Sequence, residues 1–383
     1  MKKNIIYSLI LVLSTLLFSC NDDFLERAPI DELTDENFWE SEQHVKSAAN
    51  ACYWALIGKD LPINISEGMS DNALWYTLTG WRQIGSGLYG SDFSMLNTRF
   101  KDSYRQLRRC NYFLKNYQRA TSVKPETLEQ YAAEVRFLRA FTYYYLTCFW
   151  GDVPLVIEPV NMGDEAVTAP RTSREEIVDF MLKELSEAAE ALPVYIEPAT
   201  NNFGRISGTA AKAMEARVAL QNKRWEVARD ASKALMPGGK YAYHQLYSTG
   251  RPKQDYFDLF TFEGRASRKA ANKEAILSYV FNFDAASPTR HNLSRELQVP
   301  DQIIRFNATK SLIDSYLCTD GLPVEKSPLY KGNGTYTPAY SAYDSLFVNR
   351  DPRMKQSIVY PGYDKWNGKL DGRGTTNAAE DAS

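Results

Sequence analysis

The chain has 383 residues, enough for a large core or for two ordinary domains, and its 45 basic and 47 acidic side chains nearly cancel. We therefore expect no nucleic-acid partner, because proteins that bind phosphate backbones carry an excess of Lys and Arg. Only three histidines occur beside 24 tyrosines and 7 tryptophans, so neither a histidine-rich metal site nor a cofactor is expected.

The amino terminus has the pattern of a bacterial lipoprotein signal. Lys2 and Lys3 precede an apolar run over 5–18, which leads directly to Cys20 in the letters LFSC. The run is shorter than the about 20 residues of a membrane-spanning helix, which favours a signal that is cleaved. We expect residues 1–19 to be removed and Cys20 to carry the lipid anchor, with 20–40 as a tether. The alternative is an ordinary secretory signal with an incidental cysteine.

Residues 41–240 have the spacing of apolar side chains that is typical of amphipathic helices. Ser41 can cap the first helix, and Ser173 with Glu176 forms a capping box for a later one. Alanines would let paired helices approach closely, as in tetratricopeptide-type repeats, although no strict period is visible. We predict a mainly α protein on an irregular, tetratricopeptide-like scaffold, with helices near 41–58, 100–117, 128–149 and 173–193 and two over 207–236.

Residues 241–383 differ in composition, since they are rich in aromatic residues, Gly, Pro and Asn. One β-strand is predicted at 275–283, and the rest indicates long connections, which suit a binding face carried by a rigid helical support. The polar ending GKLDGRGTTNAAEDAS lacks apolar periodicity and has the character of a loop rather than of a natural terminus. We expect a loop-rich, aromatic-rich second half with a few short strands.

Four cysteines follow Cys20, and they are widely spaced without a C-x-x-C pair, so neither a zinc ribbon nor a thioredoxin site is indicated. An exported compartment would allow disulfides. Cysteine on the core face of a helix is, however, more often a small buried hydrophobe, so free thiols are favoured. The four are Cys52, Cys110, Cys148 and Cys318.

Several blocks of the sequence resemble the SusD/RagB family of starch-utilisation-type outer-membrane lipoproteins, and they occur in the family's order. The start of the expected mature chain, CNDDFLERAPIDELTDENFW, is similar to the family's amino-terminal segment. The most specific block is AEVRFLRAFTYYYLTCFWGDVPL at 133–155. Further similar blocks are PRTSREEIVDFMLKEL at 170–185, GRISGTAAKAMEARVAL at 204–220, YLCTDGLP at 316–323 and NRDPRMKQSIVYPG at 349–362.

The resemblance implies a helical half, a loop-rich half, a surface glycan site and no catalytic residues. It also implies a partner, a TonB-dependent transporter of the SusC type, and a location on the outer membrane. The pair Asp22 and Asp23 after Cys20 resembles the signal that sends such lipoproteins to the cell exterior, although a solvated tether would look the same. The family's helical, alanine-rich carboxy-terminal segment has no counterpart here, so we expect the chain to stop short of it.

The stretch 66–98 supplies what a sugar site needs, because sugars present apolar C–H faces and many hydroxyls. Trp75 and Trp81 are the predicted platforms, although one tryptophan could instead pack in the core. Glycines at 80, 85, 87 and 90 argue for a loop, and the family's site draws on a loop in this region. Phe283, near Arg290 and His291, could complete the site. The predicted glycan-binding residues are Asp71, Asn72, Trp75, Tyr76, Trp81 and Arg82.

Other chemistries find less support. The letters GSGLYG at 85–90 match a dinucleotide fingerprint, but no buried strand precedes them. No GxSxG, HExxH or P-loop motif occurs, so we expect a binding protein and not an enzyme. The predicted function is capture of oligosaccharides for the transporter. The alternatives are a peptide-binding protein or transporter lid without sugar specificity, and a surface glycosidase.

Overall fold

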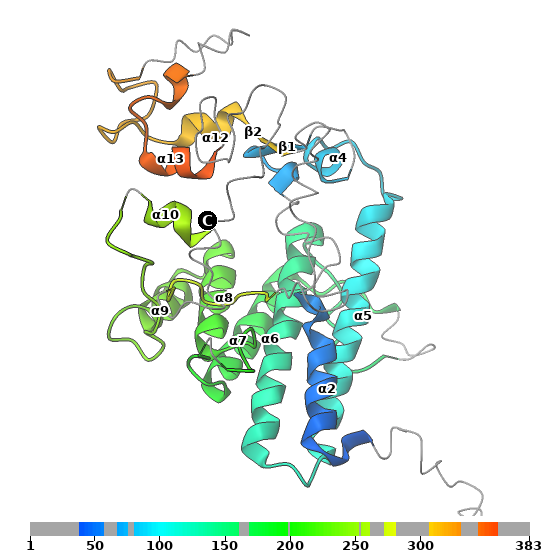
Figure 1. The fold of residues 1–383 in the computed structure, drawn as a ribbon. Helices are drawn as coiled ribbons and strands as arrows, with labels where there is room; N and C mark the ends of the chain where they lie inside the picture. Colours follow the sequence, from blue (N-terminus) through cyan, green and yellow to red (C-terminus); the bar gives the residue numbers. More distant parts are fainter. Residues whose placement is uncertain are drawn as a thin grey trace, which may run out of the picture.

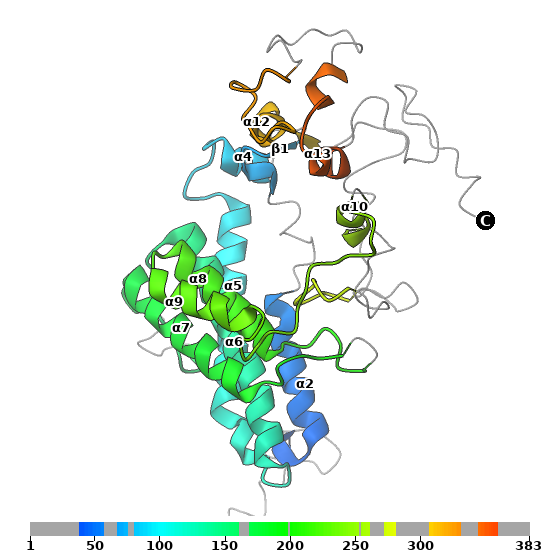
Figure 2. The same ribbon diagram turned by 90° about the vertical axis from the view of Figure 1, so that its left-hand side faces the viewer.

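A computed structural model describes residues 38–56, 67–75, 80–160, 168–197, 200–252, 254–260, 272–280, 306–330 and 344–358. Long helices lie side by side in one part of the molecule, and short elements gather above them (Figures 1 and 2). Each long helix packs against the next along the chain. They are α2 (Glu42–Cys52), α5 (Ser94–Asn116), α6 (Pro125–Trp150), α7 (Arg174–Ala191), α8 (Gly208–Gln221) and α9 (Trp225–Leu235).

Two helices start where the capping signals predicted them, although α2 ends at Cys52, before the expected end at Gly58. The Ser41 hydroxyl accepts from the His44 N–H at 3.3 Å at the start of α2, and Ser173 accepts from Glu176 at the same distance at the start of α7. Gly151 ends α6 with φ of 66°, a conformation that favours glycine. The predicted helical scaffold is confirmed, and Gly58, the expected end of the first helix, lies outside the described residues.

The apolar stripes of these helices form one buried cluster. Leu107 of α5 and Leu138 of α6 are among its fully enclosed members. Small residues bring the helices close, and Gly208 at the start of α8 is the clearest case. A Cβ there would lie 3.0 Å from the Ala189 carbonyl oxygen and 2.9 Å from the Tyr241 ring. Close packing of this kind is what the alanine-rich sequence predicted.

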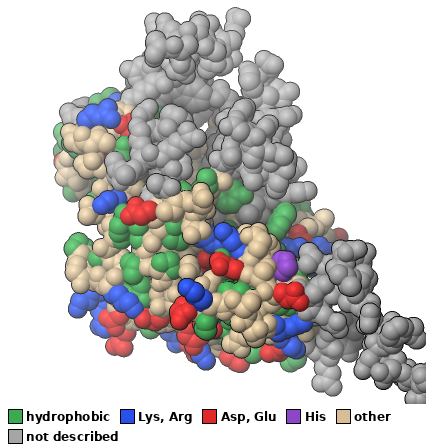
Figure 3. Space-filling view, turned by 60° about the horizontal axis from the view of Figure 1, so that its bottom comes forward, with side chains coloured by type: hydrophobic (Ala, Val, Ile, Leu, Met, Phe, Trp, Pro, Cys, Tyr) green, Lys and Arg blue, Asp and Glu red, His purple; other side chains and the backbone are tan. Residues whose placement is uncertain are grey.

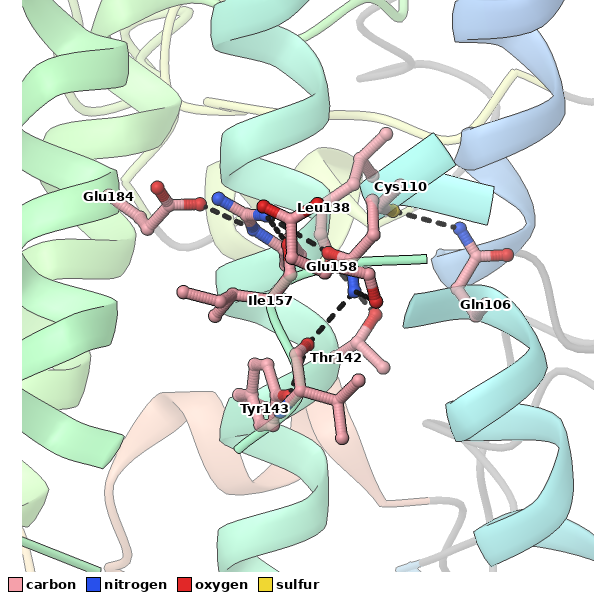
Figure 4. Close-up of polar contacts among 11 residues, drawn as sticks. Gln106, Cys110, Leu138, Thr142, Tyr143, Ile157, Glu158 and Glu184 are labelled. Carbon is pink, nitrogen blue, oxygen red and sulfur yellow. Dashed lines mark hydrogen bonds and ion pairs between the residues drawn. The ribbon is translucent and has the colours of Figure 1, made fainter. Parts of the chain in front are cut away.

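A buried polar network fixes the chain that follows α6 against the helices (Figure 4). Arg139 donates from Nε to Glu184 of α7 at 2.8 Å and from Nη1 to the Asn111 side chain of α5 at 2.9 Å. The Asn111 amide donates in turn to the Val156 carbonyl at 2.9 Å, as does the Tyr143 hydroxyl. The Val156 carbonyl is thereby satisfied from two helices, α5 and α6, and α7 joins the network through Glu184.

A second buried ion pair joins α6 to the segment before α8. Glu134 is fully buried, and the Arg205 guanidinium contacts both of its carboxylate oxygens. The Tyr53 hydroxyl donates to Glu134 at 2.9 Å, and Arg205 also donates to the Asn50 side chain at 2.7 Å. Burial raises the pKa of the Glu134 carboxyl, while the Arg205 charge opposes this rise.

The scaffold's surface is charged but mixed in sign. On the face in Figure 3, acidic and basic side chains are interspersed and are not separated by sign. The described residues include exposed pairs of opposite sign, such as Arg105 with Asp102, 2.7 Å apart, and Arg229 with Asp230, 2.8 Å apart. Such a surface matches the near-neutral charge balance of the sequence. Across the described ranges, no helix combines the length and apolar character needed to span a bilayer.

The upper part of the molecule combines residues from both halves of the chain. It contains β1 (Ala73–Trp75), α4 (Trp81–Gly85), β2 (Phe306–Ala308), α12 (Lys310–Ser315) and α13 (Pro352–Ser357), with α10 (Asp255–Leu259) packed against α13. A small core of its own surrounds Phe347 and Met354.

Short 3-10 helices occur along the whole described chain, at Phe38–Glu40, Tyr53–Ala55, Glu67–Met69, Tyr117–Arg119 and Asp344–Phe347.

The predicted strand at 275–283 is wrong for the part that the structure describes. Residues 272–280 form no strand, and 281–283 lie outside the described residues. The Asn272 side chain accepts from the N–H groups of Glu274 and Ala275, while Ile276 and Leu277 pack on the helical core. The apolar run therefore reflects burial against helices and not pairing in a sheet. The predicted fold class, mainly α with a few short strands, is confirmed.

Candidate functional site

The predicted site residues that the structure describes lie at the upper end of the molecule, where the two halves of the chain meet (Figure 1). β1 pairs with β2 in antiparallel register, with Leu74 opposite Asn307. The stretch 66–98 was predicted as a loop, but it holds β1, α4 and the start of α5. A strand could not be recognised here from sequence because its partner lies more than 200 residues away.

Thr309 connects this stretch to the second half of the chain. Its N–H donates to the Asn72 carbonyl at 3.0 Å, and its hydroxyl donates to the Asp71 carbonyl. The same hydroxyl oxygen caps α12 by accepting from the Leu312 N–H at 3.2 Å. The backbone that carries two predicted site residues is therefore fixed to the start of α12. Sequence reasoning missed Thr309, although its place before a short apolar helix is a capping signal.

Two further contacts hold the end of β1 and the end of α4 in place. Arg82 donates from Nη1 to the Trp75 carbonyl at 3.1 Å, so part of its guanidinium holds the end of β1. Gly85 packs so closely that a Cβ would lie 2.4 Å from the Met69 carbonyl oxygen. Gly85, the first glycine of the letters GSGLYG, thus ends α4 and packs against Met69. This packing explains why a glycine occurs here, and no bound nucleotide is needed to account for it.

Trp75 is the predicted platform that the structure leaves partly open. It ends β1 on the same face as the buried Ala73, and its own side chain is partly exposed. Leu74, on the opposite face, is 43% exposed. Tyr76, predicted to stack beside Trp75, lies outside the described residues. An aromatic side chain at this position can present apolar area to a sugar while its backbone is fixed by Arg82.

Trp81 lies in a different environment. Its side chain is only 7% exposed, because the Arg99 guanidinium lies 4.3 Å from the centre of its ring and Phe149 of α6 packs beside it at 6.3 Å. In this structure the indole joins α4 to α5 and α6 and offers little surface to a ligand. This burial favours the alternative that one of the two tryptophans packs in the core. No sequence signal pointed to Arg99.

Asp71 and Asn72 are both exposed next to β1. The Asn72 amide donates to the Glu67 carboxylate at 2.6 Å, and the Ser70 hydroxyl donates to the same oxygen at 2.9 Å. Glu67, which sequence reasoning did not single out, therefore orients Asn72. Two exposed polar side chains and a partly open aromatic ring thus occur within five residues of one another.

Other predicted features fall outside what the structure describes. The signal, Cys20 and the predicted tether up to residue 37 lie there, whereas the last three residues of the tether, 38–40, form a 3-10 helix in which Trp39 is buried. The later candidates Phe283, Arg290 and His291 lie in 281–300, also outside the described residues. Over the described ranges, no group of three or more His, Cys, Asp or Glu side chains could hold a metal ion. All four cysteines after Cys20 are free thiols, as favoured from the sequence.

The chain is similar to known proteins both in sequence and in structure. The chain is 29% identical to SusD-like protein P25 of Formosa agariphila over 242 residues, 58% of this chain and 44% of that protein. It resembles two crystal structures from Bacteroides fragilis, each at 24% identity. One, a SusD-like protein, has a TM-score of 0.71 over 88% of this chain and 63% of its own. The other, a SusD-like carbohydrate-binding protein, has a TM-score of 0.70 over 87% and 62%.

These likenesses differ in what they establish. At this level of identity the crystal structures show the shared fold, and the chain spans less than half the length of its Formosa relative. The sequence profile of a SusD-like family described as "Starch-binding associating with outer membrane" matches residues 23–220, more than half of the chain. The protein therefore belongs to the SusD-like family, whose members are binding proteins of the outer membrane and not enzymes.

Proposed function

We propose that the protein captures glycans at the cell surface through the stretch 67–82 and passes them to a TonB-dependent transporter of the SusC type. The observation that carries the proposal is the partly open Trp75 beside the exposed Asp71 and Asn72, on a backbone fixed by Arg82 and Thr309. Sugar recognition uses an aromatic face with hydrogen-bonding groups at its edge, and a fixed backbone reduces the entropy lost on binding.

Family membership supports the same function. The family's description names starch binding and the outer membrane, and one structural relative is a carbohydrate-binding protein. Because the family is non-catalytic, the alternative of a surface glycosidase is dropped. The proposed anchor is the lipid on Cys20, facing the cell exterior, which would hold the binding site at the mouth of the transporter.

The test is retardation in native gels cast with different polysaccharides. We compare the chain from residue 21 with its Trp75→Ala variant and with Trp225→Ala as a matched control. Trp225 is 60% exposed at the start of α9, and α9 lies in the helical part of the molecule, apart from β1 and α4 (Figure 1). Circular dichroism confirms that each protein is folded. Retardation by one glycan that Trp75→Ala abolishes and Trp225→Ala retains would support the proposal.

Other outcomes contradict parts of it. Retardation that survives Trp75→Ala would place the glycan elsewhere on the molecule. A folded protein that no glycan retards, but that binds peptides saturably, would favour the peptide-binding or lid alternative. Trp81→Phe is expected to leave retardation nearly unchanged, because the buried ring is replaced by another aromatic side chain. Partnership with the transporter is tested separately, by copurification from outer membranes.

A further inference from the structure

The outward face of α5 carries a row of exposed basic side chains, which we call the basic stripe. Their spacings of three, four and seven residues place them on one side of the helix, while Leu107 and Cys110 on the other side are buried. The stripe is about 21 Å long, because its first and last members are 14 residues apart and an α-helix rises 1.5 Å per residue. Its members are Lys101, Arg105, Arg108, Arg109 and Lys115.

Two carboxylates contact the basic stripe, fewer than its five cations. Asp102 lies 2.7 Å from Arg105, and Glu158 lies 3.8 Å from Lys115. All four of these side chains are more than half exposed, so water screens the attraction within both pairs. Positive charge therefore predominates on this face of the described structure, although the whole chain is nearly neutral.

An aromatic ring lies among these cations. Tyr112 is 37% exposed, and it lies on the same side of α5 because it follows Arg108 by four residues and precedes Lys115 by three. Arg108 donates from Nε to the Val160 carbonyl at 2.9 Å, which orients its guanidinium. Guanidinium groups bind carboxylates and other oxyanions through paired N–H donors, and a tyrosine ring can contact the C–H face of a sugar. Together these groups match a sugar that carries an acidic group.

The basic stripe begins close to the predicted glycan site. Met95 in the first turn of α5 packs on Gly80, where an added Cβ would lie 3.1 Å from the Met95 terminal carbon, and the Arg99 guanidinium covers the Trp81 ring. Lys101, the first member of the stripe, follows two residues later, and from there α5 leads away from α4 (Figure 1). A linear chain bound in the upper part of the molecule can therefore continue along this helix.

We propose that the basic stripe binds an acidic polysaccharide, a glycan whose sugars carry carboxylate or sulfate groups, where the chain extends beyond Trp75. This inference rests on the proposed function and names the class of glycan that is captured. A row of cations on one helix face matches a linear chain with anions at intervals, and salt weakens such an attraction.

A membrane surface of anionic phospholipids is the competing partner. The end of the predicted tether lies beside the stripe, since the Trp39 ring packs 6.3 Å from the Tyr112 ring. The partly exposed Tyr112 within the stripe and the start of the stripe close to the glycan site favour the polysaccharide.

The experiment measures Kd by titration calorimetry for the full chain, purified in detergent, at low and at high salt. The probes are polygalacturonate for carboxylate groups, dextran sulfate for sulfate groups, and amylose as the neutral glycan. We expect one or both acidic glycans to bind more tightly than amylose at low salt, and high salt to remove this preference.

Two kinds of variant locate the contact. Lys101→Glu with Arg109→Glu should raise Kd for the acidic glycan about tenfold, equivalent to about 1.4 kcal/mol, in line with the loss of two exposed charge contacts. The control, Lys183→Glu with Arg229→Glu on α7 and α9, changes the net charge equally and should leave this Kd unchanged. Asp102→Asn should lower it, because the variant removes one of the two carboxylates at the stripe. Circular dichroism confirms that each variant is folded.

Three results would overturn the inference. The first is an equal Kd for the acidic glycan in the stripe variant and in the control. The second is binding of amylose, lost in Trp75→Ala, with no preference for an acidic glycan, which leaves the proposed function intact. The third is binding to phosphatidylglycerol vesicles, but to neither acidic glycan, that depends on Lys101 and Arg109, which assigns the stripe to the membrane. A folded protein that binds no glycan, acidic or neutral, contradicts the proposed function itself.

Discussion

Replacing Glu134 by Gln tests whether burial makes the ion pair with Arg205 critical for stability. The carboxylate is fully buried, and the Arg205 side chain is only 13% exposed. The substitution keeps the size of the side chain and a partial hydrogen-bonding capacity toward Tyr53. It leaves the Arg205 charge in the same enclosed place without its counter-charge, with Asn50 as a remaining acceptor.

The expected loss of stability in Glu134→Gln follows from the burial of both side chains. Removing one member of a buried ion pair costs about 3–5 kcal/mol, because the remaining charge is not compensated. Total stabilities of folded domains are about 5–15 kcal/mol, so the loss is a large share. The matched control is Asp102→Asn, which breaks an ion pair with Arg105 whose side chains are 56% and 72% exposed. Exposed pairs contribute about 0–1 kcal/mol.

Urea unfolding followed by circular dichroism measures both losses from the midpoint and slope of the transition. We expect a large shift for Glu134→Gln and a small one for Asp102→Asn. Adding Arg205→Met to Glu134→Gln should recover part of the stability, because the uncompensated charge is removed as well. Equal shifts for the two single variants would refute the reasoning that burial decides the energy of the pair.

Three further predictions concern packing, pH and the site. Gly208→Ala should lower the free energy of unfolding by about 1–3 kcal/mol in the same assay, since the added Cβ meets the Ala189 backbone. Gly90→Ala is the control and should be near neutral, because its Cβ meets only a flexible side chain. Burial lowers the pKa of His244, so the folded state resists protonation of this ring and the free energy of unfolding should fall as pH drops below about 6.5. If the wild type and His244→Gln lose the same free energy of unfolding over this pH range, the prediction is contradicted. Thr309→Ala should weaken α12 by about 0.5–2 kcal/mol and lower glycan affinity in titration calorimetry; unchanged affinity would show that this support is dispensable.

Local signals in the sequence were sufficient for the helical scaffold. Apolar spacing and the caps at Ser41 and Ser173 predicted the helices, because a helix satisfies its backbone within one segment and its ends are fixed by adjacent side chains. The predicted strand at 275–283 failed over its described part, 275–280, for a related reason. A strand needs a partner, and the apolar residues there find the helical core instead.

The site shows where sequence reasoning stops. The sequence alone placed Trp75 and Trp81 as equal candidates, with polar neighbours and glycines that indicated a loop. Only the tertiary structure separated them, since α5 and α6 enclose Trp81 while β1 ends with Trp75 partly open. Exposure depends on which distant segments fold over a side chain. The pairing of β1 with β2 has the same origin, because contacts between remote residues leave no periodic pattern in the chain.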